Sequence, residues 1–225
     1  TPLVGGPATA VSMINVTPDA QRTMCTFLGA SVEFSDDDVD KDTVEAAKIV
    51  YLEGYLFDAE AARRAFAKAA GLAHGAGRMI ALTLSDSFVV ERHRAGLMGF
   101  IETQVDLLFA NESEICALFE TNDFDAAVAA LRPHVKLAAI TRSEAGSVIL
   151  SRGERLTVAA EPVEKVVDTT GAGDQYAAGF MFGLSRGRPL QQCGQLASLA
   201  AAEVISHYGP RPLVPLKDLA AAKGY

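Results

Sequence analysis

The chain has 225 residues, of which 49% are hydrophobic and 21% are charged, so it can bury a substantial core in one globular domain with at most a small appendage. Its net charge of -8 argues against a broad surface for nucleic acid or anionic membranes, and we expect neither partner. No apolar run approaches the roughly 20 residues that span a bilayer, and the N-terminus lacks a signal-peptide pattern. We therefore expect a cytoplasmic protein.

The first residues do not resemble the start of a domain. Residues 1–6 have no initiating methionine and read as a loop from the middle of a domain, so we expect a fragment whose N-terminal part is missing. Residues 8–16 and 22–28 are rich in strand-forming side chains, and the Thr-Pro-Asp-Ala-Gln stretch at 17–21 predicts a turn between them. The simplest structure is a β-hairpin.

Apolar strands alternate with helical segments in the next part of the chain. Strands are predicted at 49–52, 79–84 and 105–110, with a helix at 41–48, a helix from Asp58 to His74, and another after Ser85-Asp86. This alternation indicates a parallel sheet covered on both faces. Ligands bind such sheets where strands end and helices begin, and four polar side chains hold such positions: Tyr55, Asp86, Asn111 and Thr141.

The pattern Asn-x-x-Glu at residues 111–114 opens a predicted helix. Taken alone, it is a capping box, with Asn111 as the N-cap and Glu114 three residues later. Further on, a strand is predicted at 136–141, an edge hairpin at 147–150 and 155–159, and a last long helix from Pro189 to about His207.

The most informative stretch is Asp168-Thr-Thr-Gly-Ala-Gly-Asp174, which we call the glycine corner (residues 168–174). It leads into a segment with apolar side chains at helical spacing, so it lies at a helix N-terminus. The first N–H groups of a helix have no partner within it and attract anions. Glycines let the amides of Gly171, Ala172 and Gly173 approach a phosphate group closely. Asp174 either caps the helix or accepts a proton from an attacking hydroxyl.

At these seven residues the sequence resembles the ribokinase-like (PfkB) family of carbohydrate and nucleoside kinases, whose signature D-T-x-G-A-G-D it matches in full. The resemblance implies a ribokinase-like α/β fold, with a mostly parallel sheet between helices and a small β lid. Residues 4–35 would form the lid and substrate wall, and residues 36–225 the nucleotide-binding core. It also implies that Asp174 is the catalytic base and that the amides of Gly171 to Gly173 form the anion hole for the transferring phosphoryl group.

The resemblance implies further ligand-binding residues. Asn111 and Glu114 would mark the region of Mg²⁺ and the phosphates. Thr141, Arg142 and Gly146 would form the loop that binds ATP, although Ser143 replaces a glycine of the family pattern T-x-G-x-x-G. Asp168 and Thr170 would hold a monovalent cation such as K⁺. His207 would border the adenine, with a favourable charge at a helix end as the alternative.

The segment from Gly6 to Ala30 is similar to the adenosine kinase branch of the family. This similarity would bring Arg22 to the phosphates and Met24 to the base, with Tyr55 on the other side of a purine; a solvated Arg22 on a strand edge is the alternative. We therefore predict an ATP-dependent kinase that phosphorylates the 5′-hydroxyl of a nucleoside, with adenosine as the first candidate. A sugar kinase for ribose, fructose or a keto-deoxy sugar acid stays open, as do a non-catalytic nucleotide-binding fragment and a homodimer.

Overall fold

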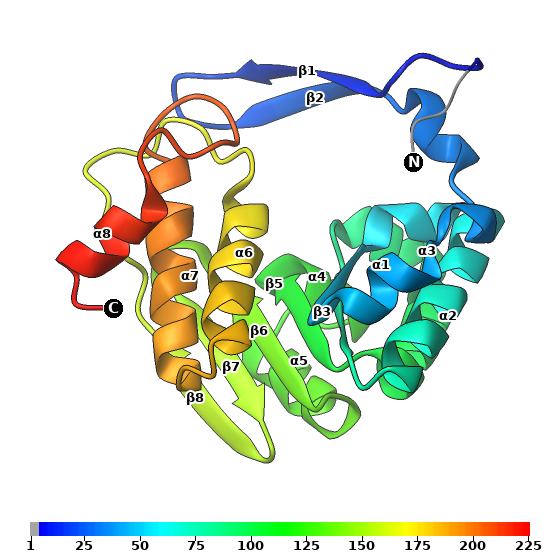
Figure 1. The fold of residues 1–225 in the computed structure, drawn as a ribbon. Coiled ribbons are helices and arrows are strands. Elements are labelled where there is room, and N and C mark those ends of the chain that lie inside the picture. Colours follow the sequence, from blue (N-terminus) through cyan, green and yellow to red (C-terminus); the bar gives the residue numbers. More distant parts are fainter. Residues whose placement is uncertain (1–4) are drawn as a thin grey trace. The chain divides into compact units, whose positions relative to one another are not determined.

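In the computed structural model, residues 5–225 are described, and the expectation for residues 1–4 lies outside them (Figure 1). The chain divides into two compact units. Unit 1 comprises the described residues up to Ala10 together with Leu28–Ile140 and Leu150–Arg155. Unit 2 comprises Val11–Phe27, Thr141–Ile149 and Leu156–Tyr225. The expected division at residue 35 stays a prediction.

The chain has the ribokinase-like α/β fold, and its strands run in the six-stranded order β3-β4-β5-β6-β7-β8. Their bounds are β3 Ile49–Glu53, β4 Met79–Thr83, β5 Leu107–Asn111, β6 Leu137–Thr141, β7 Ser147–Ser151 and β8 Glu154–Val158. The registers of β3 with β4 and of β4 with β5 are parallel. The carboxyl ends of these three strands therefore lie at one edge, directly before Tyr55, Asp86 and the helix that follows Asn111.

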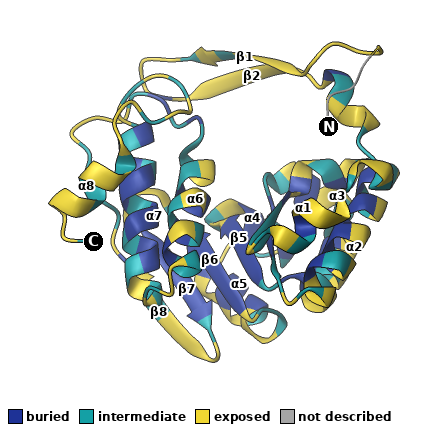
Figure 2. Cartoon of the chain, viewed as in Figure 1, coloured by how far each residue is buried: buried dark blue, intermediate teal, exposed yellow. Residues whose placement is uncertain are grey.

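Unit 1 contains the helices α1 Lys41–Ala46, α2 Glu60–Gly75, α3 Ser87–Gln104, α4 Glu112–Leu118 and α5 Phe124–Leu131. Its strands are almost continuously apolar because both faces of the sheet are covered. Ile80, Leu82, Leu107 and Leu108 are fully buried, and the dark-blue strands of Figure 2 show this core.

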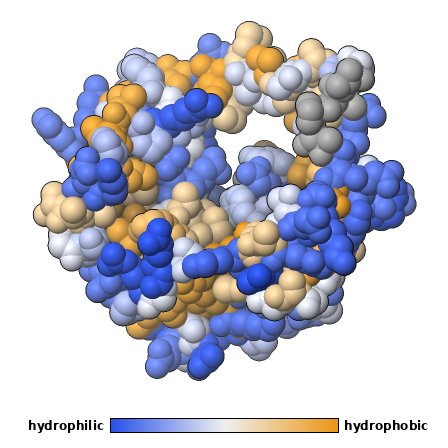
Figure 3. Space-filling model, in the orientation of Figure 1, coloured by the Kyte–Doolittle hydropathy of each residue, from blue (hydrophilic) through white to orange (hydrophobic). Residues whose placement is uncertain are grey.

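Unit 2 contains the helices α6 Ala172–Ser185, α7 Leu190–Val204 and α8 Leu216–Ala222. Helices α6 and α7 pack closely, since a Cβ added at Gly179 would lie 2.7 Å from the carbonyl oxygen of Leu196. The predicted hairpin is confirmed: β1 Val11–Val16 pairs antiparallel with β2 Arg22–Phe27. Its surface carries exposed apolar side chains such as Met13 and Met24, and Figure 3 shows orange atoms on it.

The structure corrects one predicted helix cap. Helix α2 begins after Ala59, which makes no side-chain cap, whereas Asp58 lies in a 3₁₀ turn over Gly54–Asp58. The Asp58 carboxylate instead binds Arg92 and His93 of α3. By contrast, Asp86 caps α3 as predicted, accepting the N–H of Phe88 at 2.7 Å. Among the described residues, no helix is long and apolar enough to cross a membrane.

Candidate functional site

The glycine corner has the backbone of a helix N-terminus. Gly171, with φ of 79°, is the N-cap of α6, and a Cβ added there would lie 2.8 Å from the Cβ of Pro210. A Cβ added at Gly173 would meet no atom within 4 Å. Glycine is therefore required at 171 by the backbone and by its neighbour, whereas at 173 its absence of a side chain leaves open space beside the helix end.

Two of the three expected amides are available to a ligand. Within the described part of the chain, the N–H groups of Gly171 and Gly173 have no hydrogen-bond partner. The prediction differs at Ala172, whose N–H donates to the carbonyl oxygen of Thr169 at 3.3 Å because the chain turns tightly before α6. Two open amides at the positive end of a helix dipole still favour an anion.

The side chain of Asp168 holds this turn in place through hydrogen bonds. It is 4% exposed, and its Oδ1 accepts the N–H of Thr170 at 2.9 Å and the Thr170 hydroxyl at 2.6 Å. Its Oδ2 accepts the N–H of Gly209 at 3.0 Å. Burial raises the pKa of Asp168, but the hydrogen bonds from Thr170 and Gly209 outweigh it and the pKa is lowered. Asp168 is thus an ionised structural anchor, and its role at a cation stays a prediction.

Asp174, the other acid of the glycine corner, is exposed, whereas Asp168 is buried. Asp174 lies in the first turn of α6. No hydrogen bond or ion pair joins its carboxylate to any residue that the structure describes. An acid in this turn is favoured by the helix dipole. Since its oxygens are open to solvent, they are accessible to an incoming hydroxyl group.

Arg22, the first residue of β2, reaches the glycine corner. Its Nη1 donates to the hydroxyl oxygen of Thr169, 147 positions further along the chain. This guanidinium places a permanent positive charge beside the turn, and its field contributes to lowering the pKa of Asp168. Arg22 is nevertheless exposed on its strand, and its role at the phosphates stays a prediction. Met24 lies on the same strand, and its side chain is exposed.

The loop after β6 keeps the backbone that a glycine pattern requires. Thr141 ends β6, and the N–H of Arg142 donates to the carbonyl oxygen of Gly146 at 2.8 Å. Ser143 adopts φ of 50°, the left-handed conformation that glycine takes readily. Gly146 has φ of 83°, and a Cβ there would lie 2.1 Å from the carbonyl oxygen of Val158. Replacement of a glycine by Ser143 therefore leaves this turn intact.

His207 follows α7 and pairs with a residue one turn earlier. Its Nε2 lies 3.3 Å from Oε1 of Glu203, and its Nδ1 lies 3.1 Å from the carbonyl oxygen of Tyr208. These contacts fit a residue that shapes the end of the helix. Contact with adenine stays a prediction for His207.

In unit 1, Asn111 and Glu114 form a complete capping box. Oδ1 of Asn111 accepts the N–H of Glu114 at 2.9 Å, and the Glu114 carboxylate accepts the N–H and the side-chain Nδ2 of Asn111 at 2.9 and 2.8 Å. Glu114 is 5% exposed. Burial, above all, raises its pKa to about 7; the Asn111 N–H acts against this, and the charge of Asp86 adds to it. The structural interpretation of this motif is confirmed, and its role at Mg²⁺ stays a prediction.

Tyr55 lies past the end of β3 and is 54% exposed. It belongs to unit 1 and Met24 to unit 2. The purine sandwich between these two side chains therefore stays a prediction.

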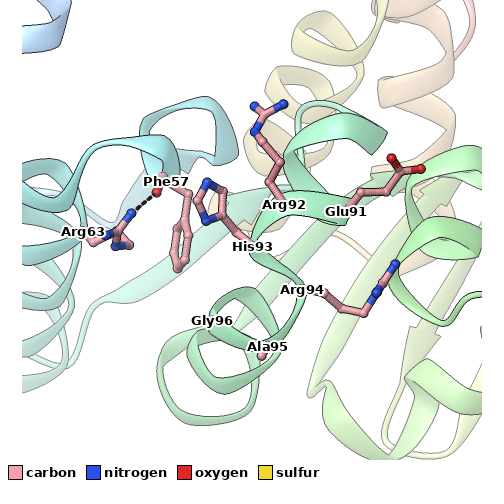
Figure 4. A pocket seen from close by; sticks show the side chains of 8 residues that line it. All are labelled: Phe57, Arg63, Glu91, Arg92, His93, Arg94, Ala95 and Gly96. Atoms are coloured by element: carbon pink, nitrogen blue, oxygen red, sulfur yellow. Dashed lines mark hydrogen bonds between the residues drawn. The ribbon is translucent and has the colours of Figure 1, made fainter.

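A separate cavity of about 380 Å³ in unit 1 is lined by residues of the 3₁₀ turn, α2 and α3 (Figure 4). Its three arginines already bind within the protein. Arg63 donates to the carbonyl oxygen of Phe57 at 2.6 Å, Arg92 binds the Asp58 carboxylate at 2.9 Å, and Arg94 bonds the carbonyl oxygen of Ala117 at 3.1 Å. Arg92 and Arg94 lie on either side of the kink of α3 at His93, and we assign the cavity no part in the site.

Comparison with known proteins shows the family of the chain. The sequence model of the pfkB family carbohydrate kinases matches residues 3–217. The chain belongs to the pfkB family. A solved adenosine kinase from Sinorhizobium meliloti is 50% identical with a TM-score of 0.96, over 99% of this chain and 68% of that one. A probable sugar kinase from Rhizobium etli is 46% identical with a TM-score of 0.94, over 96% of this chain and 66% of that one.

Some curated relatives of the pfkB chain carry nucleoside kinase names and others carry sugar kinase names. An adenosine kinase from Saccharomyces cerevisiae is 30% identical over 203 residues, which are 84% of this chain and 59% of the yeast protein. A cytidine kinase from Thermococcus kodakarensis is 40% identical over 121 residues, 52% of this chain and 42% of that protein. The chain thus spans about half the length of the curated relatives it matches.

A structure of a putative ribokinase II from E. coli, 21% identical with a TM-score of 0.85, is a complex with ATP and Mg²⁺. Mg²⁺ is usually held by one or two carboxylates together with phosphate oxygens and water rather than by a protein cage. In the described residues no group of three or more His, Cys, Asp or Glu side chains could hold a metal ion. The charges of Glu114 and Asp86 interact, and a role for Glu114 at Mg²⁺ stays a prediction.

Sequence reasoning missed two residues that shape the glycine corner. The Thr169 hydroxyl oxygen accepts a hydrogen bond from Arg22, and the backbone N–H of Gly209 donates one to Asp168. Both bonds join residues far apart in the chain, so no local pattern indicates them.

Proposed function

We propose that this pfkB chain carries the phosphoryl-transfer site of an ATP-dependent kinase that acts on the 5′-hydroxyl of a nucleoside, with adenosine as the first substrate to test. The observation that carries the proposal is the pairing of open amides at Gly171 and Gly173 with an unpartnered, exposed Asp174 in the first turn of the same helix. An anion site and a free base on one helix end are what transfer of a phosphoryl group to a hydroxyl requires.

In the proposed reaction, the hydroxyl oxygen of the nucleoside forms a bond to the γ-phosphorus of ATP. The bond between that phosphorus and the β–γ bridging oxygen breaks, and ADP leaves. The hydroxyl proton passes to the carboxylate of Asp174. The amides of Gly171 and Gly173 stabilise charge on the phosphoryl oxygens, and Arg22, held at Thr169, adds a positive charge beside them.

Bound Mg²⁺ would neutralise charge on the ATP phosphates, and Glu114 is the residue that we propose to support it. Thr141, Arg142 and Gly146 would line the nucleotide, since their loop keeps a glycine-type backbone even with Ser143 in it. A requirement for K⁺ at Asp168 and Thr170 is a further part of the proposal. It would appear as a rate that rises with added K⁺ at constant ionic strength.

The names of similar proteins support a nucleoside as the acceptor. Adenosine kinases from S. meliloti and yeast and a cytidine kinase from T. kodakarensis are among them. The exposed Met24 on β2 offers an apolar surface to a base. A sugar as acceptor is the second candidate, because the R. etli protein of 46% identity is described as a probable sugar kinase.

The test is a screen of the protein with Mg-ATP and adenosine, cytidine, inosine, ribose or fructose, read by mass spectrometry of the phosphorylated product as well as by ADP release. We expect phosphorylation of adenosine above the sugars. A product from ribose or fructose alone would establish the second candidate. Stabilisation by ATP in thermal-shift titration without any phosphorylated product would contradict both and leave a nucleotide-binding protein.

A further inference from the structure

Glu203 is an acid in an unfavourable place. It lies in the last turn of α7 (Leu190–Val204), and its side chain is 8% exposed. A negative charge near a helix C-terminus is opposed by the helix dipole, and burial of a carboxylate is costly unless hydrogen bonds compensate for it. The helix itself therefore gains nothing from this acid.

The partners of Glu203 lie beyond the helix. Its Oε1 accepts the backbone N–H of Leu213 at 2.8 Å and that of Val214 at 3.4 Å. Nε2 of His207 lies 3.3 Å from the same oxygen. Hydrogen bonds to an ionised acceptor are the stronger kind. Through Leu213 and Val214, Glu203 thus ties the far end of residues 205–214, which we call the post-helix segment, to the end of α7.

The post-helix segment contacts the glycine corner and the residues directly before and after it. Ile205 accepts the N–H of Val167 at 2.8 Å, and Gly209 donates to Asp168 at 3.0 Å. The carbonyl oxygen of Pro210 accepts the side chain of Gln175 at 3.3 Å. The Pro210 ring occupies the space where a side chain at Gly171 would lie. This segment is therefore one wall of the turn that presents the open amides.

We infer that Glu203 is a positioning residue for the glycine corner. It touches neither the open amides nor Asp174; it acts through the backbone of the post-helix segment, which sets the place of Asp168 and Gly171. A shift of about 1 Å in such a group costs up to about 10²-fold in rate when a reaction depends on alignment. The effect on rate rests on the proposed kinase function, whereas the effect on the backbone does not.

The variants separate hydrogen bonding from charge. Glu203→Ala removes the acceptor. Glu203→Asp keeps the carboxylate but shortens the side chain, so that it lies further from Leu213 and Val214. Glu203→Gln loses the charge and keeps an amide oxygen at the position of Oε1. Asp218→Ala, which removes an exposed acid of α8, is the matched control. Hydrogen–deuterium exchange of each protein reports on the backbone amides, and steady-state kinetics with Mg-ATP and adenosine report on the rate.

We expect Glu203→Ala to speed exchange roughly 10-fold in residues 205–214 and 167–175, the scale of losing a hydrogen bond to a charged group. Exchange in β1 and β2 should stay unchanged. The kcat should fall about 10-fold or more with the KM for the nucleoside nearly constant, Glu203→Gln should restore both readouts, and the control should match wild type. If Glu203→Ala does not fold, Glu203→Asp is compared with Glu203→Gln in the same way.

Unchanged exchange at residues 167–175 in Glu203→Ala or Glu203→Asp would overturn the inference. So would acceleration spread evenly over unit 2, which marks a general loss of stability, or a normal kcat in an active protein. If wild type transfers no phosphoryl group, the proposed function fails, and the exchange pattern still decides the role of Glu203.

Discussion

The carboxylate of Asp168 accepts the backbone N–H of Gly209, 41 positions further along the chain, at 3.0 Å. Through its other oxygen it holds Thr170, the residue before the N-cap of α6. One buried acid thus joins the turn before the helix to the segment that follows the next helix. The anion site depends on this connection as much as on its glycines.

We expect Asp168→Asn to lower the free energy of unfolding by about 2–3 kcal/mol, because an amide cannot accept on both sides and leaves a buried group unpaired. Since the pKa of Asp168 is lowered in the folded protein, its contribution is present above the ordinary value of 3.8 and is lost as the pH falls through the folded pKa. Urea unfolding of wild type and Asp168→Asn at pH 7 and in acid checks the size of the stability loss and its dependence on pH. Asp174→Asn, at an exposed position, should leave stability within about 0.5 kcal/mol. Equal losses in the two variants would contradict the anchoring role.

Gly146→Ala should destabilise the protein by more than about 2 kcal/mol, because the new Cβ would lie 2.1 Å from the carbonyl oxygen of Val158. Gly187→Ala is the matched control: Gly187 also has positive φ, 69°, but a Cβ there meets no atom within 4 Å. It should lose only about 1–2 kcal/mol, from backbone strain. The urea unfolding midpoints of the two variants give the difference in their stability. Equal losses would mean that the loop around Gly146 moves to accommodate the new Cβ.

Ser143→Gly should leave the free energy of unfolding unchanged or raise it, by up to about 1 kcal/mol. Relief of the left-handed φ of 50° opposes the greater entropy of unfolded glycine. Urea unfolding measures it, with Ser151→Gly in β7 as a control expected to lose about 0.5–1 kcal/mol. If Ser143→Gly lost as much free energy of unfolding as Ser151→Gly, the left-handed backbone at Ser143 would carry no strain that glycine relieves.

Much of the fold could be predicted from local sequence. The hairpin, the parallel strands and the capping box of Asn111 and Glu114 each have a signal within a few residues. Helix α5 has a local signal as well, since Asp123 caps a segment with Phe124, Val128 and Leu131 buried at helical spacing. Asp58 misled because a residue suited to capping is bound instead by Arg92, 34 positions away.

The candidate site was predictable to the extent that it lies within one motif. The heptapeptide at 168–174 indicated the helix end, its glycines and Asp174. The hydroxyl of Thr169 lies 147 positions from its partner Arg22, and Gly209 lies 41 positions from its partner Asp168, so both bonds depend on how the chain folds. The local pattern also could not reveal that the amide of Ala172 is turned back to Thr169.

The Glu114 carboxyl should make stability depend on pH. Its folded pKa of about 7 exceeds the ordinary 4.5, so the folded state binds the extra proton between these values and the free energy of unfolding falls as pH rises through that window. Glu114→Gln should flatten this dependence, whereas Glu91→Gln, at an exposed acid, should keep it. Urea unfolding between about pH 5 and about pH 8 measures the slope. If the free energy of unfolding of Glu114→Gln varied with pH as in wild type, other groups would cause the pH dependence.

The most direct test of the phosphoryl-transfer site is the kcat of Asp174→Asn with Mg-ATP and whichever acceptor wild type phosphorylates, beside Asp218→Asn as an exposed control. Loss of a general base should lower kcat by at least about 10²-fold, with the Kd for ATP and the unfolding midpoint unchanged. The control should match wild type. A kcat for Asp174→Asn close to that of wild type would contradict the claim that this carboxylate takes the proton beside the glycine corner.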